Sequence, residues 1–569
     1  MADRLSAASA LREIGRRLQI TGGNPFRAKA FVRGAGALSG QPLDLATLVR
    51  EKRLQKLRGI GPALAGVIEE LHRTGRSRLL DRLRDELPRG VLELSRVPTL
   101  SLARIRALQD ALGIDSLESL ESACRAGKVR SVKGFGPRTE ERLLAAIQRL
   151  REGYGQVHLH RALEVGEPLV EHLLASPAIA RADLAGGLRR RCETVSSLPV
   201  VATGTSAEAV ADRLFSFPLV ESAGPVRPPS ATAILANGLP VRLAWVPPER
   251  YGSALAEETG TASHWRRLEA LARERGLARG VAGIEAADEA AFYAQLGLPW
   301  IPPELREDQG EVDAALRGEL PPRLVTVEDI RGMVHCHTHY SDGRDSVLEM
   351  AQAARRLGMS YITITDHSPT AAYAGGVTLD RLERQWDEIA QAQEATGIRI
   401  LRGTESDILA DGSLDYPDSV LEKLDVVVAS IHNRYRMDAR AMTERVTRAL
   451  ALPLFKIWGH ARGRLIGRRP PFECDMERIL DVAAGARVAI EVNGDPYRLD
   501  MDPAWIREAR KRGVPFVVSV DAHSTRELAN VRFGVDTARR GWLQRSHVLN
   551  TLEAPEFAAR VRPLNGTRR

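Results

Sequence analysis

The sequence predicts a multidomain protein with an α-helical N-terminal region, an α+β middle region and a C-terminal barrel of alternating strands and helices. Three observations support this fold class. The chain has 569 residues, more than one hydrophobic core normally accommodates. Residues 1–150 carry Leu, Ala and Arg at three- and four-residue spacings, which is typical of helices. After residue 330, short apolar runs alternate with amphipathic segments, which is typical of βα units.

The composition favours a folded protein without a membrane span. Apolar residues make up 44% of the chain and charged residues 27%, as in ordinary globular proteins. Apolar runs stay well short of the length that a membrane helix needs, and the charges that follow Met1 predict no signal peptide. The four widely spaced cysteines do not form a disulfide framework. We therefore expect a cytoplasmic protein.

Positive charge is concentrated in the N-terminal region. The whole chain carries a formal net charge of +8. Residues 1–155 hold 29 Lys and Arg against 17 Asp and Glu, a net charge of +12, so the other 414 residues carry −4. This asymmetry predicts a polyanionic partner for the N-terminal region, most often nucleic acid.

Two glycine motifs interrupt the helical N-terminal region and resemble helix–hairpin–helix motifs. Gly59-Ile60-Gly61-Pro62 and Gly134-Phe135-Gly136-Pro137 each lie between two helical patterns. Glycine permits a tight turn, and the N–H groups that open the next helix can face a phosphate. We expect contacts to DNA backbone without sequence readout from Gly59, Gly61, Lys133, Gly134, Gly136 and Arg138. A plain helical connector is the alternative for each motif. Residues 96–102 occupy the place of a further copy but lack both glycines.

The predicted secondary structure changes twice in the middle of the chain. Short apolar runs between residues 155 and 245 favour a mixed α+β domain, and residues 250–300 return to a helical pattern. The Pro- and acid-rich stretch at 301–330 is typical of a linker.

Seven strand-like runs follow this stretch, and nearly every one ends in a residue that can bind a metal ion. The runs are 333–337, 361–365, 399–404, 425–430, 455–459, 487–492 and 515–520. Active sites of βα barrels lie at the C-terminal ends of strands, so these residues should converge. Imidazoles and carboxylates together suit Zn²⁺, Mn²⁺ or Fe²⁺, and their number predicts two or three divalent ions. We exclude His339 from the ligands, whereas Glu491 is either a support for a ligand or an ordinary strand-end acid.

The motifs at these strand ends resemble the polymerase and histidinol phosphatase (PHP) domain. They lie at 335–343, 365–368, 403–405, 430–432, 459–460 and 519–523. The resemblance covers about 330–569 and implies a distorted seven-stranded barrel with a trinuclear metal site, in which Glu405 bridges ions. It implies His337, Glu405 and Asp521 as catalytic residues. The metal ligands that it implies are His335, His337, Asp342, His367, Glu405, His432, His460, Asp521 and His523.

Further segments resemble bacterial family X DNA polymerases fused to a PHP domain. They are Tyr416-Pro417, 538–543 and, near the N-terminus, 24–31. The resemblance implies two helix–hairpin–helix domains, a nucleotidyltransferase-like palm, a thumb, a linker and the PHP barrel. The expected boundaries are 1–80, 81–150, 151–245, 246–315, 316–330 and 331–569.

The palm lacks the acids that polymerisation requires. Relative to the family pattern, Gly187 replaces a serine, Ser197 and Pro199 stand where an Asp pair is expected, and Arg242 replaces a third Asp. Nucleotidyl transfer needs carboxylates that hold two Mg²⁺ ions. We therefore predict a palm that folds without polymerising. The alternative is a shifted register in which other acids serve, namely Asp183, Glu193 or Glu208.

The leading functional hypothesis is a metal-dependent 3′–5′ exonuclease in DNA repair, acting on gapped or 3′-ended DNA. Arg462 and Arg464 follow His460 and could contact phosphates, with a solvated basic loop as the alternative. Two competing hypotheses remain: a phosphomonoesterase for a small metabolite, since a barrel does not fix its substrate, and a DNA-binding scaffold without catalysis.

Overall fold

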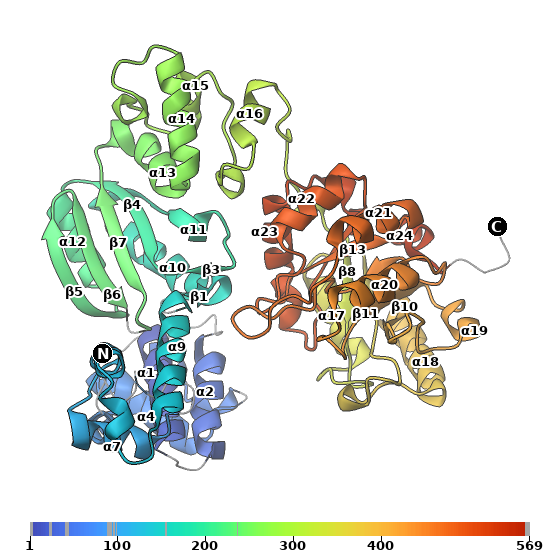
Figure 1. The fold of residues 1–569 in the computed structure, drawn as a ribbon, viewed down its shortest axis with the longest axis horizontal. Coiled ribbons are helices and arrows are strands. Elements are labelled where there is room, and N and C mark those ends of the chain that lie inside the picture. The colour runs from blue at the N-terminus through green and yellow to red at the C-terminus, as the bar shows by residue number, and fades with distance from the viewer. Residues whose placement is uncertain are drawn as a thin grey trace. The chain divides into compact units, whose positions relative to one another are not determined.

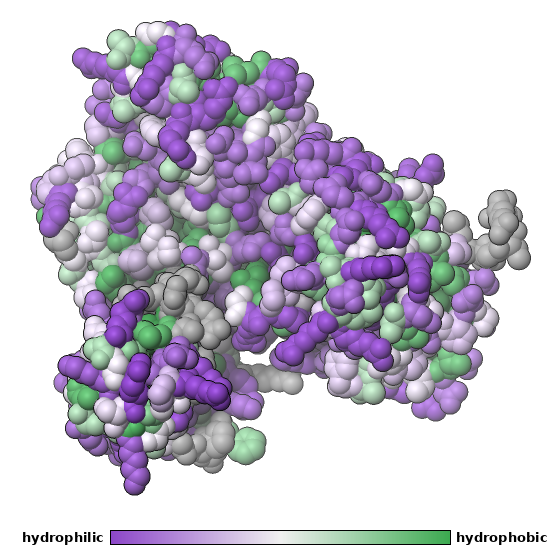
Figure 2. All heavy atoms as spheres, viewed as in Figure 1, coloured by the Kyte–Doolittle hydropathy of each residue, from purple (hydrophilic) through white to green (hydrophobic). Residues whose placement is uncertain are grey.

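The computed structural model describes residues 4–21, 25–39, 45–57, 59–87, 94, 97, 100–153, 156–235 and 237–563. The chain forms two compact units (Figure 1). One holds most of residues 1–248, and the other holds the segments 158–164 and 185–195 together with 249–569. Within the described residues, every helix is too short or too polar to cross a membrane. Hydrophilic side chains cover much of the visible face, with small apolar areas between them (Figure 2).

The N-terminal region is helical, as predicted. Its buried residues gather in two apolar clusters, one drawn from residues 7–83 and one from 87–147. The described helices are α1 (Arg4–Ile20), α2 (Pro25–Ser39), α3 (Leu45–Arg50), α4 (Pro62–Thr74), α5 (Arg78–Glu86), α7 (Leu102–Leu112), α8 (Leu117–Arg125) and α9 (Pro137–Gly153).

The middle region contains a five-stranded mixed sheet in the order β2-β4-β7-β6-β5. Strands β4 and β7 run parallel, whereas the other neighbours are antiparallel. Helix α12 (Ala207–Phe215) packs on this sheet. The strands are β2 (Ile179–Leu184), β4 (Leu198–Gly204), β5 (Val220–Arg227), β6 (Ser230–Leu235) and β7 (Pro240–Trp245).

A small helical region precedes the barrel, and its apolar cluster, drawn from residues 256–324, also includes Trp542. Within it, the Glu289 carboxylate lies 2.6 Å from Arg189 and is also bonded by the buried Arg306. The helices are α13 (Tyr251–Thr259), α14 (Ala262–Glu274), α15 (Glu289–Gln295) and α16 (Glu311–Leu316).

The C-terminal region is a seven-stranded parallel sheet in chain order, with helices between the strands. The strands are β8 (Gly332–Cys336), β9 (Tyr361–Ile364), β10 (Arg399–Asp407), β11 (Val426–Ser430), β12 (Ile457–Trp458), β13 (Ala489–Asn493) and β14 (Phe516–Ser519). The helices are α17 (Val347–Arg356), α18 (Leu379–Thr396), α19 (Asp418–Leu421), α20 (Ala439–Leu450), α21 (Met476–Ala486), α22 (Pro503–Lys511), α23 (Val531–Arg540) and α24 (Ala554–Val561). The predicted barrel is thus confirmed.

The barrel closes between its first and last strands. Cys336 forms a parallel bridge with Ala522, and the Ala522 N–H donates to the His335 carbonyl at 3.1 Å. At the other end of the seam, the buried Asn550 donates to the carbonyls of Gly332 and Val518. Closure therefore brings the ends of strands β8 and β14 together.

Candidate metal centre

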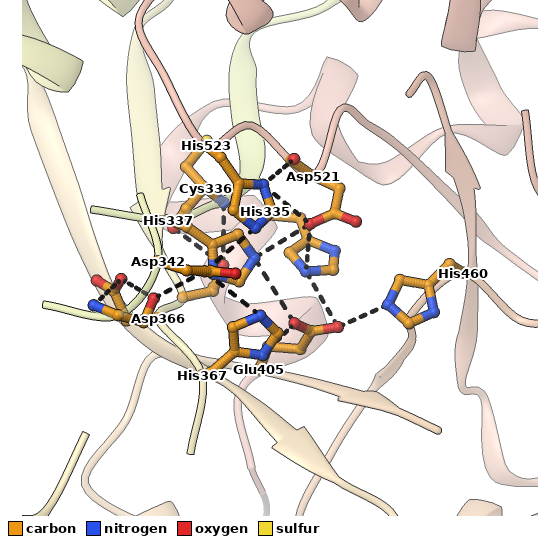
Figure 3. Close-up of polar contacts among 12 residues, drawn as sticks. His335, Cys336, His337, Asp342, Asp366, His367, Glu405, His460, Asp521 and His523 are labelled. Carbon is orange, nitrogen blue, oxygen red and sulfur yellow. Dashed lines mark hydrogen bonds and ion pairs between the residues drawn. The ribbon is translucent and has the colours of Figure 1, made fainter. Parts of the chain in front are cut away.

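All nine predicted ligands converge at the C-terminal ends of the barrel strands. Figure 3 shows eight of them directed toward one centre. They form three overlapping groups of possible ligand atoms: His337, Asp342, His367 and His523; His335, His337, Glu405 and Asp521; and His367, Glu405 and His432. His460 joins them through its contact with Glu405.

Glu405 lies at the middle of the cluster. Its Oε1 is 2.8 Å from His460 Nε2, 3.2 Å from His432 Nε2 and 3.3 Å from His335 Nε2. Its Oε2 is 2.9 Å from His367 Nδ1 and 3.6 Å from His337 Nε2. One buried carboxylate thus faces five imidazoles, which is the position that a bridging ligand occupies.

Two aspartates complete the donor set on the side of the closing strand. Asp521 Oδ1 lies 3.1 Å from His337 Nε2 and 3.6 Å from His335 Nε2. Asp342 Oδ1 lies 3.2 Å from His523 Nε2 and 3.6 Å from His367 Nε2. Ligands from the first and last strands therefore share one site.

These distances fit ligands around metal ions. Two atoms that each lie about 2.1 Å from one tetrahedral ion are about 3.4 Å apart, close to the spacings in the cluster. Despite these short distances, several of the buried atoms make no hydrogen bond of acceptable geometry to the described residues, including His335 Nε2, His337 Nε2 and Glu405 Oε2. Unpartnered buried polar atoms are costly, so the donor set fits divalent ions.

The acids and histidines of the cluster shift one another's pKa values. Burial alone would raise the pKa of Glu405, but His432 and His335 hold that pKa well below its usual range. Burial opposes protonation of His432, yet Glu405 and Asp407 raise its pKa to about 10. Burial and the neighbouring His523 lower the pKa of His337 to about 3. In the metal-free chain His337 is therefore neutral, whereas His432 is protonated and paired with Glu405 and Asp407. A divalent ion bound there would replace the His432 proton, because metal ligands must be deprotonated.

A second layer of acids orients the histidines. Glu491 is fully buried; its Oε1 lies 2.5 Å from His335 Nδ1 and 2.6 Å from Ser519 Oγ. Its Oε2 accepts from the His460 backbone N–H. Asp407 Oδ1 lies 2.5 Å from His432 Nδ1. Such carboxylates fix the ring and tautomer of a metal-binding histidine. The structure thus resolves the alternatives for Glu491 in favour of a support.

Three of the predicted ligands lie in a strained backbone conformation. His335, His460 and Asp521 have φ values of 62°, 21° and 51°, a region that costs non-glycine residues about 1–3 kcal/mol each. Gly459 precedes His460, and a Cβ there would lie 2.2 Å from Ser430 Oγ. The backbone at these positions therefore keeps a strained conformation that places the donor side chains in the cluster.

The arginines near the site differ from one another in their partners. Arg464 donates to the Leu499 carbonyl and lies 2.7 Å from Glu193, and Arg462 donates to the Phe472 carbonyl at 3.4 Å. Arg498, which sequence reasoning missed, has Nε 3.3 Å from Asp521 Oδ2. Its Nε and Nη1 are buried without a hydrogen-bond partner in the described part of the chain. Arg498 therefore offers N–H groups beside the metal cluster.

Comparison with known proteins places the chain in a family. It is 35% identical over 557 residues to the DNA polymerase/3′-5′ exonuclease PolX of Bacillus subtilis strain 168, a match that covers 95% of this chain and 96% of that relative. The chain belongs to the bacterial family X DNA polymerases with a PHP domain. Family matches cover a helix-hairpin-helix domain at 4–77, a SAM-like helix-hairpin-helix tandem at 91–149, a DNA polymerase beta thumb at 254–307 and a PHP domain at 334–495.

About a third of the chain or slightly more also resembles proteins with other names. A "probable phosphatase" of Caldanaerobacter subterraneus is 28% identical over 213 residues, covering 34% of this chain and 77% of the relative. Another of Vibrio campbellii is 28% identical over 242 residues, covering 40% and 91%. Part of this family X chain is therefore similar to shorter proteins.

The two hairpins of the family X chain have matching local structure. Gly59 and Gly134 have φ values of 94° and 92°, which only glycine adopts freely. Each is followed by a buried apolar residue and then by a helix that begins at Pro62 or Pro137. Lys133 and Arg138 are exposed at the second hairpin. In the segment 96–102, which occupies the place of a further copy without its glycines, residues 96, 98 and 99 lie outside the described residues.

The five-stranded sheet holds two of the residues that stand at the expected positions of the polymerase acids. Strands β4 and β7 pair Pro199 with Arg242, so the positions expected for two of the acids are neighbours across the sheet. Glu193, one of the alternative acids, pairs with Arg464. Within the described residues, the groups able to hold a metal ion all lie in the barrel.

Proposed function

We propose that this protein is a metal-dependent 3′–5′ exonuclease that trims DNA ends in repair. The observation that carries the proposal is the complete nine-ligand cluster in a chain that also has two helix–hairpin–helix motifs. The relative from B. subtilis is named as a 3′-5′ exonuclease as well as a polymerase. We further propose the cytoplasm as its location and Mn²⁺, Zn²⁺ or Fe²⁺ as the bound ions.

The nine predicted ligands would hold divalent ions, which would favour deprotonation of a water molecule near neutral pH and offset charge on a phosphoryl group. The protein's own contribution is to position the groups. Glu405, His337 and Asp521 hold the donors together, and Glu491 fixes the His335 ring. Arg498 pairs with Asp521 through Nε, and its Nη1, which has no hydrogen-bond partner among the described residues, would bind a phosphoryl oxygen. Arg462 and Arg464 remain proposed phosphate contacts, although both already bond protein atoms.

We propose that the palm no longer polymerises. A proline and an arginine at the neighbouring positions of β4 and β7 cannot hold Mg²⁺, and the Arg242 charge would repel it. We also propose the six domain boundaries predicted above. The N-terminal hairpins would hold the DNA backbone through Gly59, Gly61, Lys133, Gly134, Gly136 and Arg138.

A paired assay on one gapped substrate tests the proposal. With Mn²⁺ and no dNTPs, the protein should shorten the labelled strand from its 3′ end. With dNTPs it should not extend that strand. A variant that carries both His337→Ala and Asp521→Ala should lose the trimming activity. Substitution of the exposed Leu357 by Ala should leave the trimming activity unchanged. Trimming by the double variant at the wild-type rate would refute the assignment to the barrel.

A phosphomonoesterase is the second candidate, favoured by the "probable phosphatase" relatives of the barrel. Comparing turnover of a small phosphate ester with turnover of DNA separates the two candidates. The exonuclease proposal expects DNA to be preferred and the preference to fall when residues 1–150 are deleted.

A further inference from the structure

Tyr373 is an exposed aromatic residue at the edge of the metal centre. It belongs to the single turn η7 (Ala372–Ala374) between β9 and α18, and 70% of its surface is exposed. Its ring centroid lies 6.1 Å from that of His367 and 6.2 Å from that of His432. A large aromatic side chain thus stands in solvent beside two metal ligands.

The loop that carries Tyr373 is well anchored. The Val377 N–H donates to the His367 carbonyl at 2.8 Å, and the Thr370 N–H donates to Asp415 at 3.0 Å. The buried Tyr416 donates its hydroxyl to the Val377 carbonyl from beneath the loop. The backbone at Tyr373 is therefore held in place relative to the ligands while its side chain is presented outward.

The ring of Tyr373 has a face available for a flat partner. It is inclined at 59° to the His367 ring and at 61° to the His432 ring, so neither imidazole stacks on it. The nearby Tyr435 differs, because its face is covered by the Arg469 guanidinium at 3.9 Å. An uncovered aromatic face on an anchored loop is the feature by which proteins stack nucleic-acid bases.

We propose that Tyr373 is the platform on which the terminal base of the trimmed strand stacks while its phosphate lies at the metal centre. The inference rests on the proposed exonuclease function and specifies the substrate as a nucleotide end, in preference to a phosphate ester without a base. Stacking tolerates every base, because each has a π-face. This agrees with hairpins that bind DNA backbone without sequence readout.

The first test is a binding measurement that does not depend on turnover. Wild-type protein loaded with Mn²⁺ is titrated into a single strand that ends in 2-aminopurine, with a phosphorothioate at the last linkage to slow cleavage. Stacking should quench the fluorescence. Tyr373→Phe should quench as the wild type does, whereas Tyr373→Ala should lose most of the quenching. Leu357→Ala is the exposed control and should behave as the wild type.

The second test compares removal of a normal 3′ nucleotide with removal of a 3′ abasic nucleotide. The wild type should remove the normal nucleotide about tenfold faster, and Tyr373→Ala should abolish this difference with unchanged metal content. Equal quenching and an unchanged rate ratio in Tyr373→Ala would overturn the platform alone. A wild-type protein that trims neither strand would overturn the proposed function and the platform together.

Discussion

Substitution of Glu491 by Gln tests whether the second layer of acids holds the metal centre. The change keeps the size of the side chain and removes its negative charge. Glu491 Oε1 faces His335 Nδ1 and Ser519 Oγ, and Oε2 accepts from the backbone of His460 and from Asn493 Nδ2 at 3.2 Å. A glutamine has one acceptor oxygen for these two pairs of donors, so its NH₂ group would face donors.

The magnitude follows from these contacts. At least two buried donors would lose their acceptor, at about 1–3 kcal/mol each, so the free energy of unfolding should fall by about 2–6 kcal/mol. The loss of a carboxylate behind a metal-binding histidine reduces metal affinity by about 10- to 100-fold. That loss corresponds to about 1.4–2.7 kcal/mol of binding free energy.

Metal affinity is measured by competition with a chromophoric chelator, and stability by denaturant unfolding of the metal-free protein. Glu508→Gln is the matched control, because Glu508 pairs with Lys511 at the surface and its loss should cost under about 1 kcal/mol. Wild-type metal affinity in a folded Glu491→Gln protein would refute the role given to Glu491.

Further predictions concern other parts of the chain. Arg498→Ala should lower kcat/KM for trimming by about 100-fold without changing the metal content. Arg498→Lys should recover part of this loss. Loss of metal from either variant would instead show that Arg498 acts by holding Asp521. Burial would raise the pKa of Glu289, but Arg189 and Arg306 lower it to about 2. The contribution of ionised Glu289 to the free energy of unfolding is therefore complete above about pH 4.5 and is lost as pH falls toward 2. In Glu289→Gln, the free energy of unfolding should depend less steeply on pH across this range. Replacing Lys133 and Arg138 by Ala should reduce the salt dependence of DNA binding by about one unit of log–log slope per lost phosphate contact, and an unchanged slope would remove both from the interface.

The barrel and its ligands were predictable because their signals are local. A strand end followed by His or Asp marks a ligand position, and Glu405 at the end of a predicted strand proved to be the central acid. The run predicted at 399–404 extends to Asp407 in β10. Asp407 could have been found, since a residue two positions from Glu405 on a strand points to the same face.

Other features depend on contacts between distant segments. The sequence around Glu491 does not show whether this residue supports His335. The 2.5 Å distance between Glu491 Oε1 and His335 Nδ1, which lie 156 positions apart in the chain, shows that it does. Arg498 lies in a loop five residues beyond β13, where no periodic pattern fixes a side chain. The palm register stays a prediction, and in the structure Pro199 pairs with Arg242 on neighbouring strands.

The closure of the barrel has a consequence for when the candidate metal centre can form. Two of the three donor groups combine residues that follow β8 with Asp521 or His523 after β14, which are more than 180 positions apart in the chain. During synthesis, a ribosome-bound chain that ends before residue 521 has its hairpins and most of its histidines but cannot complete these groups. The hairpins thus emerge early, whereas the candidate metal centre is assembled only near the end of translation. Under the proposed exonuclease function, this order of segments would keep an unfinished chain from cutting DNA that its hairpins hold.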